Sequence, residues 1–480
     1  MGKREAHRPP HPRLAATGSS KIPRGPVGCI WRFRPGVPVP ATKIVFCLSS
    51  LLTVCALSPI VSSQTAAPAK RIVIAANTVL DGKGHVLHDT RIVIEGSRIA
   101  VLDPKAGPVD YDLRGLTVLP GWIDAHVHIN WFFAKNGKLA GATFESLPQS
   151  ERDAIPSSAR ITRDDATLAS VSNVWVMLMA GFTTVQSVGS PSDLPLRDSI
   201  TRGALPGPRI LTANQPLSGQ AEKTGTPDEI RAFVRKQKDA GADLIKIYAA
   251  GGMRSGPPTL SQDQLNAACD EAKKQGLHTL VHAFRDAVRM AVLAGCTEVE
   301  HGLGATDADL KLMAERGTYF DPQAGLIVEN YLSNREKYAG TPFFPKTPEE
   351  FEPMKELLPM LHDVIQRARK VPGLKIVFGT DAVAGSHGRN AEEFIDRVRD
   401  CGVDPMSAMV SANSLGAEAM GMSDQIGSIT TGLQADIIAL DGDPLRDITA
   451  VRRVVFVMKG GIVYKNVSRS SIPAFADIQH

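Results

Sequence analysis

Short apolar runs alternate with amphipathic stretches through the middle of this chain. The apolar runs predict strands at 122–128, 183–188, 209–214, 243–249, 278–283, 298–302, 319–323 and 375–381. The stretches 227–241, 261–276 and 350–371 have the spacing of amphipathic helices. Eight alternating strand and helix units predict an α/β fold, a closed (β/α)8 TIM barrel.

Strand-like patterns with turn residues flank this region on both sides. RIVIAANTVL and TRIVIEGSRIAVLD precede it, and IGSITTGLQADIIALD and VVFVMKGGIVY follow it. We expect these segments to form one small composite β-sandwich domain from both chain ends. The expected bounds are 70–118 and 425–468 for its two parts, 119–424 for the barrel and 469–480 for a tail. Two long connections, 129–160 and 324–349, are expected to form substrate walls or lids.

A basic segment and then an apolar one precede these elements. Residues 1–43 contain nine Lys or Arg and one acid, Glu5, and residues 44–63 contain no charged side chain. This pattern predicts a leader and signal peptide over 1–63, cleavage after Ser63 and a secreted or periplasmic product. Because the basic leader is long, we expect translation to start near Val39. An uncleaved anchor is the alternative, although the run is short for a membrane span.

The rest of the chain is mildly acidic, although the formal net charge of the whole is +4. Residues 64–480 contain 45 basic and 49 acidic side chains, which gives no support for nucleic-acid binding. We expect no stable membrane span in the mature form, and a homo-oligomer is compatible with the sequence. Beyond the leader, Cys269, Cys296 and Cys401 are odd in number and scattered. They predict buried thiols rather than a disulfide framework.

Several predicted strands end in side chains that can bind metal ions. These are His126, His128, Lys246, His282, His301 and Asp381. The carboxyl ends of barrel strands converge on one mouth, where these groups would meet. His126 and His128 lie two apart on a strand and face the same side, so both can bind one ion together with Asp381. His282 and His301 end neighbouring strands and are expected to bind a second divalent ion.

Lys246 lies inside the apolar run LIKIYA, where a buried ammonium is costly unless it is paired or neutral. One alternative is that its side chain reaches the surface. The other is that its neutral amine reacts with carbon dioxide, supplied as bicarbonate, to give a carbamate that bridges two ions. Because no glutamate is available as a bridge, we expect the carbamate.

Asp381 and Tyr248 are the expected catalytic residues. Metal-bound water has a pKa of about 7; Asp381 would take its proton and deliver it to the departing amine. Tyr248 would donate a hydrogen bond to the oxyanion, and simple packing is the alternative. Glu300 precedes His301 on the strand and is expected to point away, toward the helix layer.

These motifs resemble the amidohydrolase superfamily over about residues 70–465. The matching segments are LPGWIDAHVH, GFTTVQSVG, LIKIYAAGG, LVHA, EVEHG, FGTDA and GSITTGLQADIIALDGDPL. They most resemble its imidazolonepropionase-like, Xaa-Pro dipeptidase-like branch. The resemblance implies two zinc-like ions bridged by a carboxylated lysine. A GGH element after the third strand and the VRDVG form of the second strand are missing, so the resemblance does not define the substrate.

The leading hypothesis is an exported binuclear hydrolase of dipeptides, N-acyl amino acids or related small amides. Candidate substrate residues are Trp131, Tyr248, His387 and Arg389, and surface exposure is the alternative for the last two. A mononuclear deaminase or cyclic-amide hydrolase on the same fold is the second hypothesis. A non-catalytic binding protein is the third. Esters and lactones would use the same residues, and the donors also accept manganese or cobalt.

Overall fold

A computed structural model describes residues 70–141, 161–219, 224–252 and 256–467. The expected leader and signal peptide, the tail and part of the first long connection lie outside these ranges. Among the described helices, each is too short or too polar to cross a bilayer.

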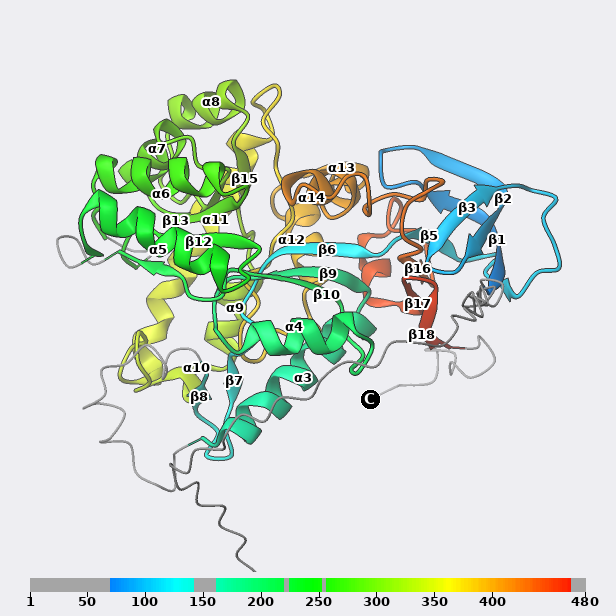
Figure 1. Cartoon of the computed structure of the whole chain (residues 1–480), viewed down its shortest axis with the longest axis horizontal. Helices are drawn as coiled ribbons and strands as arrows, with labels where there is room; N and C mark the ends of the chain where they lie inside the picture. Colours follow the sequence, from blue (N-terminus) through cyan, green and yellow to red (C-terminus); the bar gives the residue numbers. More distant parts are fainter. Residues whose placement is uncertain (1–69, 142–160, 220–223, 253–255, 468–480) are drawn as a thin grey trace, which may run out of the picture. The chain divides into compact units, whose positions relative to one another are not determined.

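Strands from both chain ends form one eight-stranded sheet, blue and red in Figure 1. They are β1 (Arg71–Leu80), β2 (Val86–Glu95), β3 (Arg98–Leu102), β4 (Tyr111–Asp112), β5 (Thr117–Pro120), β16 (Ile437–Leu440), β17 (Val454–Lys459) and β18 (Ile462–Asn466). Their order is β18-β17-β16-β5-β1-β2-β3, with β4 beside β1. The two ends join where β5 pairs antiparallel with β16, and Ile74, Val118, Ile437 and Phe456 share a core there. The domain bounds remain a prediction.

Two parallel sheets contain the middle of the chain. One has the order β10-β9-β6 and the other β11-β12-β13-β14-β15. Their strands are β6 (Trp122–Val127), β9 (Phe182–Ser187), β10 (Arg209–Thr212), β11 (Leu217–Ser218), β12 (Leu244–Tyr248), β13 (His278–Ala283), β14 (Glu298–His301) and β15 (Tyr319–Asp321). Seven of the eight predicted strands are present, because strands buried on both faces have the apolar runs that predicted them.

The eighth predicted strand, 375–381, lies between the two parallel sheets but is not a regular strand. Isolated parallel bridges join Ala382 to Val127 of β6, and Ile376 to Phe320 of β15. The segment therefore lies between β6, at one edge of the first sheet, and β15, at one edge of the second. The opposite edges of the two sheets are β10 and β11. The expectation of a regular strand here is corrected.

A buried arginine binds this irregular segment. Arg397 belongs to α12 (Glu392–Arg399) and is 2% exposed. It donates hydrogen bonds of 2.6 Å to the carbonyl oxygens of Val377 and Pro322. It also pairs with the carboxylates of Glu393 at 3.0 Å and Asp321 at 3.3 Å. Backbone bonds join Phe320 to Lys375 and Val377. The next bond of a parallel ladder would come from the nitrogen of residue 322, but Pro322 has no N–H, and the guanidinium donates to the Val377 carbonyl oxygen instead.

Helices and short strands connect these elements. They are β7 (Phe132–Phe133), β8 (Leu139–Ala140), α3 (Arg163–Met179), α4 (Asp193–Thr201), α5 (Pro227–Asp239), α6 (Gln262–Lys274), α7 (Asp286–Leu293), α8 (Asp307–Arg316), α9 (Leu326–Ser333), α10 (Arg335–Tyr338), η3 (Pro348–Glu356), α11 (Leu357–Ala368), α13 (Pro405–Ser411), α14 (Ser414–Ala419) and η4 (Ile448–Arg452). The predicted helices 227–241 and 261–276 are confirmed as α5 and α6, each started by a capping box. The predicted stretch 350–371 is divided into η3 and α11, and Pro353 lies inside η3.

Cys269 of α6 and Cys296, which precedes β14, form a disulfide, and this corrects the prediction of buried thiols. The two residues are 27 apart in sequence, but α6 and α7 lie side by side, which brings the turn after α7 near α6. Cys401 is a buried free thiol. The odd total concealed the pair, because one cysteine is simply a core residue.

We expect Arg397→Met to lower the free energy of unfolding by about 3–5 kcal/mol, because it leaves two buried carboxylates without their cation. Chemical denaturation of the variant and the wild type measures this difference. Arg399→Met on the exposed end of the same helix is the matched control and should change stability by less than about 0.5 kcal/mol. Equal effects of the two substitutions would contradict the role assigned to Arg397.

We expect one reactive thiol, Cys401, in a chain that begins at Gln64 and is denatured without reductant. Alkylation followed by mass spectrometry counts the thiols, and reduction should release Cys269 and Cys296. Cys269→Ser should lower stability by roughly 3 kcal/mol, because the open loop gains entropy in the unfolded chain. Alkylation of all three cysteines before reduction would show that the disulfide is absent.

Candidate metal centre

The six predicted metal ligands come together at the carboxyl ends of the parallel strands. β6 leads into His126 and His128, β12 carries Lys246, and β13 and β14 end near His282 and His301. Asp381 follows the irregular segment between the sheets. Except for the partly buried His282, these residues are 8% exposed or less.

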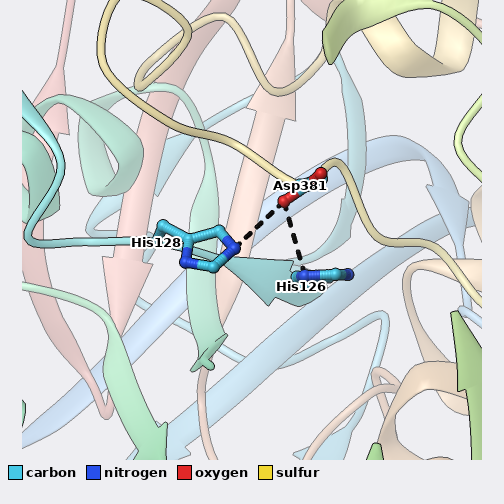
Figure 2. A group of neighbouring side chains, drawn as sticks. All are labelled: His126, His128 and Asp381. Atoms are coloured by element: carbon cyan, nitrogen blue, oxygen red, sulfur yellow. Dashed lines mark ion pairs between the residues drawn. The ribbon is translucent and has the colours of Figure 1, made fainter. Parts of the chain in front are cut away.

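Asp381 lies against both histidines at the carboxyl end of β6. Its Oδ1 atom is 3.1 Å from His128 Nε2 and 3.4 Å from His126 Nε2, and Figure 2 shows both rings directed at the carboxylate. The amine of Lys246 is 3.3 Å from the same Nε2 atom of His126. Two imidazoles, a carboxylate and an amine therefore meet at one point.

His282 and His301 lie next to this group. Their ring centroids are 4.7 Å apart, and the His301 ring is 5.3 Å from that of His126. The Nδ1 atom of His301 is 2.5 Å from Oε1 of Gln323, and His282 Nε2 is 3.3 Å from the carbonyl oxygen of Gly251. A hydrogen bond at one ring nitrogen fixes the orientation of the other, as is usual for metal-binding histidines.

Two of these residues have positive φ angles, which residues other than glycine rarely adopt. φ is 64° at His301 and 52° at Asp381. Such angles change the direction of the side chain from the one that strand alternation gives, and they cost energy that is usually tolerated only at functional sites. The backbone is thus strained at two residues whose side chains are potential ligands.

The left-handed turn at His301 also corrects the prediction for Glu300. Glu298 and Glu300 share the inner face of β14, two residues apart, and the turn adds His301 to that face. An oxygen of Glu300 lies 2.5 Å from Nδ1 of His126, and Asp321 lies 4.0 Å from the same atom. Glu300 therefore faces the histidines rather than the helix layer. The spacing of Glu298 and Glu300 was the signal for this orientation.

The electrostatics favour the forms that bind metal. Burial raises the pKa of Asp381, but the nearby His126, His128 and Lys246 outweigh it and hold the pKa at about 2. Burial and the charge of Lys246 lower the pKa of His282 to about 4. Neutral imidazoles and an ionised carboxylate are the states that bind divalent ions.

Lys246 is fully buried, and its charge is poorly solvated. Burial lowers the pKa of its ammonium, while Glu300, Asp381 and Asp321 act in the opposite direction. Burial raises the pKa of Glu300, and Lys246 lowers it. Charges of both signs are thus held in a site from which water is largely excluded.

The donor set fits a divalent metal ion. Donor atoms of His126, His128 and Asp381 all lie within 4.8 Å of one another, and the same holds for His126, Glu300 and Asp321. His126 Nδ1 and an oxygen of Glu300 lie 2.5 Å apart and pair with each other, while Nε2 of His126 faces Asp381. A histidine held at one ring nitrogen by a carboxylate, with the other nitrogen toward a second potential ligand, is typical of metal sites.

A cavity of about 610 Å³ opens from these residues. This is a volume typical of small-molecule sites. Both long connections supply residues to its wall, Trp131 from the first and Tyr331, Phe343 and Phe344 from the second. The described parts of both connections thus form walls of the cavity, and their contact with substrate stays a prediction.

The predicted substrate residues divide into two pairs. Trp131 and Tyr248 line the cavity, and burial raises the pKa of Tyr248, so its hydroxyl stays protonated. His387 and Arg389 are outside the lining. His387 Nε2 lies 3.1 Å from the carbonyl oxygen of His128, and burial lowers the pKa of His387 to about 3. Arg389 is exposed, because the chain turns away from the cavity after Val383.

A buried network that the sequence analysis missed fixes β6 relative to Asp381. Asp124 accepts hydrogen bonds from the Thr380 hydroxyl and from Asn390, both at 2.7 Å, and from the backbone nitrogen of His126 at 3.1 Å. The Thr380 hydroxyl also accepts a bond from the Ala382 nitrogen at 3.2 Å. The only signal in the sequence is that Asp124 lies two residues before His126 and Thr380 directly before Asp381. That the two side chains meet depends on the fold.

The sequence pattern of the amidohydrolase family matches residues 117–463. The ochratoxinase of Aspergillus niger is 25% identical over 450 residues, which cover 83% of this chain and 87% of that protein. The imidazolonepropionase of Rhodococcus jostii is 25% identical over 385 residues, 76% of this chain and 85% of that protein. The crystal structure of a Xaa-Pro dipeptidase with bound methionine in its active site has a TM-score of 0.70 and 29% identity, and covers 83% of this chain and 100% of that one.

We expect Thr380→Val to weaken metal binding about 10- to 100-fold, the usual cost of losing an outer partner of a ligand. The substitution keeps the side-chain volume but removes the hydroxyl that joins Asp124 to the Asp381 turn. Chelator competition with zinc measures the change. Thr279→Val, which removes a buried hydroxyl from the other end of β13, is the control and should leave the affinity unchanged. Equal affinities in wild type and Thr380→Val would refute the positioning role.

Proposed function

Since this chain belongs to the amidohydrolase family, and is therefore a metal-dependent hydrolase acting on carbon–nitrogen bonds, we propose that it is a binuclear enzyme that cleaves amide bonds of small substrates. The structural relatives imply a TIM barrel with an additional domain. We further propose that the eight strand segments close into that barrel, with the irregular segment 375–381 completing the ring. Its bridges to β6 and β15 support this closure.

His126, His128 and Asp381 would hold the first ion, and His282 and His301 the second. Lys246, as a carbamate, would contact both. The carbamate forms when the unprotonated amine attacks carbon dioxide, a carbon–nitrogen bond is made and a proton is lost. Burial of Lys246 supports this step, because it favours the neutral amine, and the product is an anion in place of a cation.

When bound, the ions supply an activated water and polarise the scissile carbonyl group. Asp381 is ionised at neutral pH and faces the cavity, so it accepts the proton of the attacking water and delivers it to the leaving amine. Tyr248 remains protonated and donates a hydrogen bond to the developing oxyanion. Four imidazoles, one carboxylate and one buried amine at the end of a single cavity are the observation that carries this proposal.

A mononuclear deaminase or cyclic-amide hydrolase is the second candidate. The imidazolonepropionase relative favours it, and so does the compact set of His126, His128 and Asp381, since three protein ligands are enough for one catalytic ion. The buried amine of Lys246 favours the binuclear site, because without a carbamate its positive charge would oppose cation binding.

The substrate proposed is a dipeptide, an N-acyl amino acid or a related amide, and the name of the Xaa-Pro dipeptidase relative supports the first of these. We also propose that the protein is exported through the 1–63 leader with cleavage after Ser63. The disulfide between Cys269 and Cys296 supports an oxidising compartment, since such bonds are rare in the cytosol of most organisms.

The test combines metal content with a substrate screen. Enzyme reconstituted with zinc and isotopically labelled bicarbonate should bind two ions per chain, take up the label and release amine from dipeptides or N-acyl amino acids. Lys246→Ala should lose the second ion, the label and more than about 100-fold of the activity, beyond the cost of losing an outer partner. A short carboxylic acid added in excess should restore part of the activity.

Lys459 offers a control, because it is a partly buried lysine whose pKa is also lowered by burial, to about 8, but it lies on β17 outside the cavity. Lys459→Ala should keep both ions, the label and the activity. A single ion in the wild type that is unaffected by Lys246→Ala would favour the mononuclear candidate. A metal-loaded protein that releases no amine from any amide would overturn the proposed function.

A further inference from the structure

A tight turn in the second long connection has a phenylalanine where glycine is normally required. The backbone nitrogen of Phe344 donates a 3.2 Å hydrogen bond to the carbonyl oxygen of Thr341, which closes a four-residue β-turn. Pro342 occupies its second position, and Phe343 occupies the third with φ of 71°. Proline followed by a residue of positive φ is the signature of a type II turn, and that third position strongly favours glycine because a side chain there is strained.

Packing does not account for the phenylalanine. Its side chain is 76% exposed, so it contributes little to the described core. Phe343 is therefore unfavourable in two ways, because its backbone is strained and its large apolar ring is exposed to water. Strain of this kind is typical of ligand clamps and active sites.

The position of Phe343 suggests what the ring contacts. Phe343 lines the metal-centre cavity, in a wall made by Trp131, Val328, Tyr331, Phe343, Phe344 and Leu357. The rings of Trp131 and Phe344 are 6.2 Å apart, and those of Tyr331 and Phe344 are 5.1 Å apart. At the other end, Trp131 lies 5.1 Å from the ring of His128. An aromatic surface thus runs from a metal ligand to the exposed turn.

We propose that Phe343 is a specificity-determining residue that closes an aromatic subsite over a planar apolar substituent of the substrate. The inference rests on the proposed amide hydrolysis and names the substrate class more narrowly: amides that carry an aromatic group on one side of the scissile bond. With the carbonyl at the metal ligands, that group lies along Trp131 and Phe344. The exposed ring of Phe343 covers it and loses its own contact with water. Offset and edge-to-face ring contacts favour such an arrangement.

Paired substrates test the subsite. N-phenylacetyl and N-acetyl derivatives of one amine differ on the acyl side, and N-benzylacetamide and N-methylacetamide differ on the amine side. In one of the pairs we expect wild-type kcat/KM to favour the aromatic member. Phe343→Gly should lower kcat/KM for that member about tenfold, which corresponds to about 1.4 kcal/mol, and change it less than about twofold for the small member. Tm should not fall, because glycine relieves the strained turn.

Two further variants control for indirect effects. Phe343→Leu keeps apolar bulk and should retain part of the preference. Asp89→Gly places glycine at another exposed residue of positive φ, 47°, on β2, and should leave the preference unchanged. Equal loss for both members of a pair, a lower Tm of Phe343→Gly or a change in its oligomeric state would overturn the subsite.

Binding of ligands that the reaction does not cleave separates this inference from the proposed function. Benzenesulfonamide should bind the metal-loaded protein more tightly than methanesulfonamide in calorimetry, and Phe343→Gly should remove the difference. If the wild type cleaves no amide but keeps this difference, the proposed function fails and the subsite stands. If amides are cleaved but the two ligands bind equally, only the subsite fails.

Discussion

Lys246 places a primary amine with no exposed surface among the acids Glu298, Glu300 and Asp321 and the histidines of the cavity. In a medium of low polarity neither sign of charge is stable alone, so each group depends on the others. The candidate site follows from this constraint. Lowered pKa values hold His126, His282 and His301 neutral, and a lowered pKa holds Asp381 ionised. The positive backbone angles at His301 and Asp381 lie within the same cluster.

Two further buried charges, on Arg397 and Asp124, hold the segment that carries Asp381. Arg397 binds the carbonyl groups of the segment that leads to Asp381, while Asp124 joins that segment to the strand of His126. These side chains add to the backbone hydrogen bonds that join the segment to Phe320 on one side and to Ala125 on the other. Asp381 is therefore held by both backbone and side-chain contacts.

The sequence predicted both the strands and the meeting of the six candidate metal ligands for the same reason. Apolar runs followed by helices identify buried parallel strands, and side chains at their ends must converge. Glu300 was misplaced because alternation assumes a straight strand, and the backbone leaves that geometry at His301. The Cys269–Cys296 pair depends on which helices are neighbours, and His387 and Arg389 on where the chain turns; neither is encoded in a local pattern. His387 and Arg389 are close to Asp381 in sequence, but their side chains lie outside the cavity that Asp381 lines.

The antiparallel pairing of β5 with β16 has a consequence for how the molecule is made. A ribosome synthesises β5 long before β16, so an early strand edge stays without its partner until almost the whole polypeptide has emerged. Contacts between such distant segments form slowly, and an open edge is prone to wrong association in the meantime. The protein thus depends, during biogenesis, on whatever keeps that edge protected until its last strands arrive.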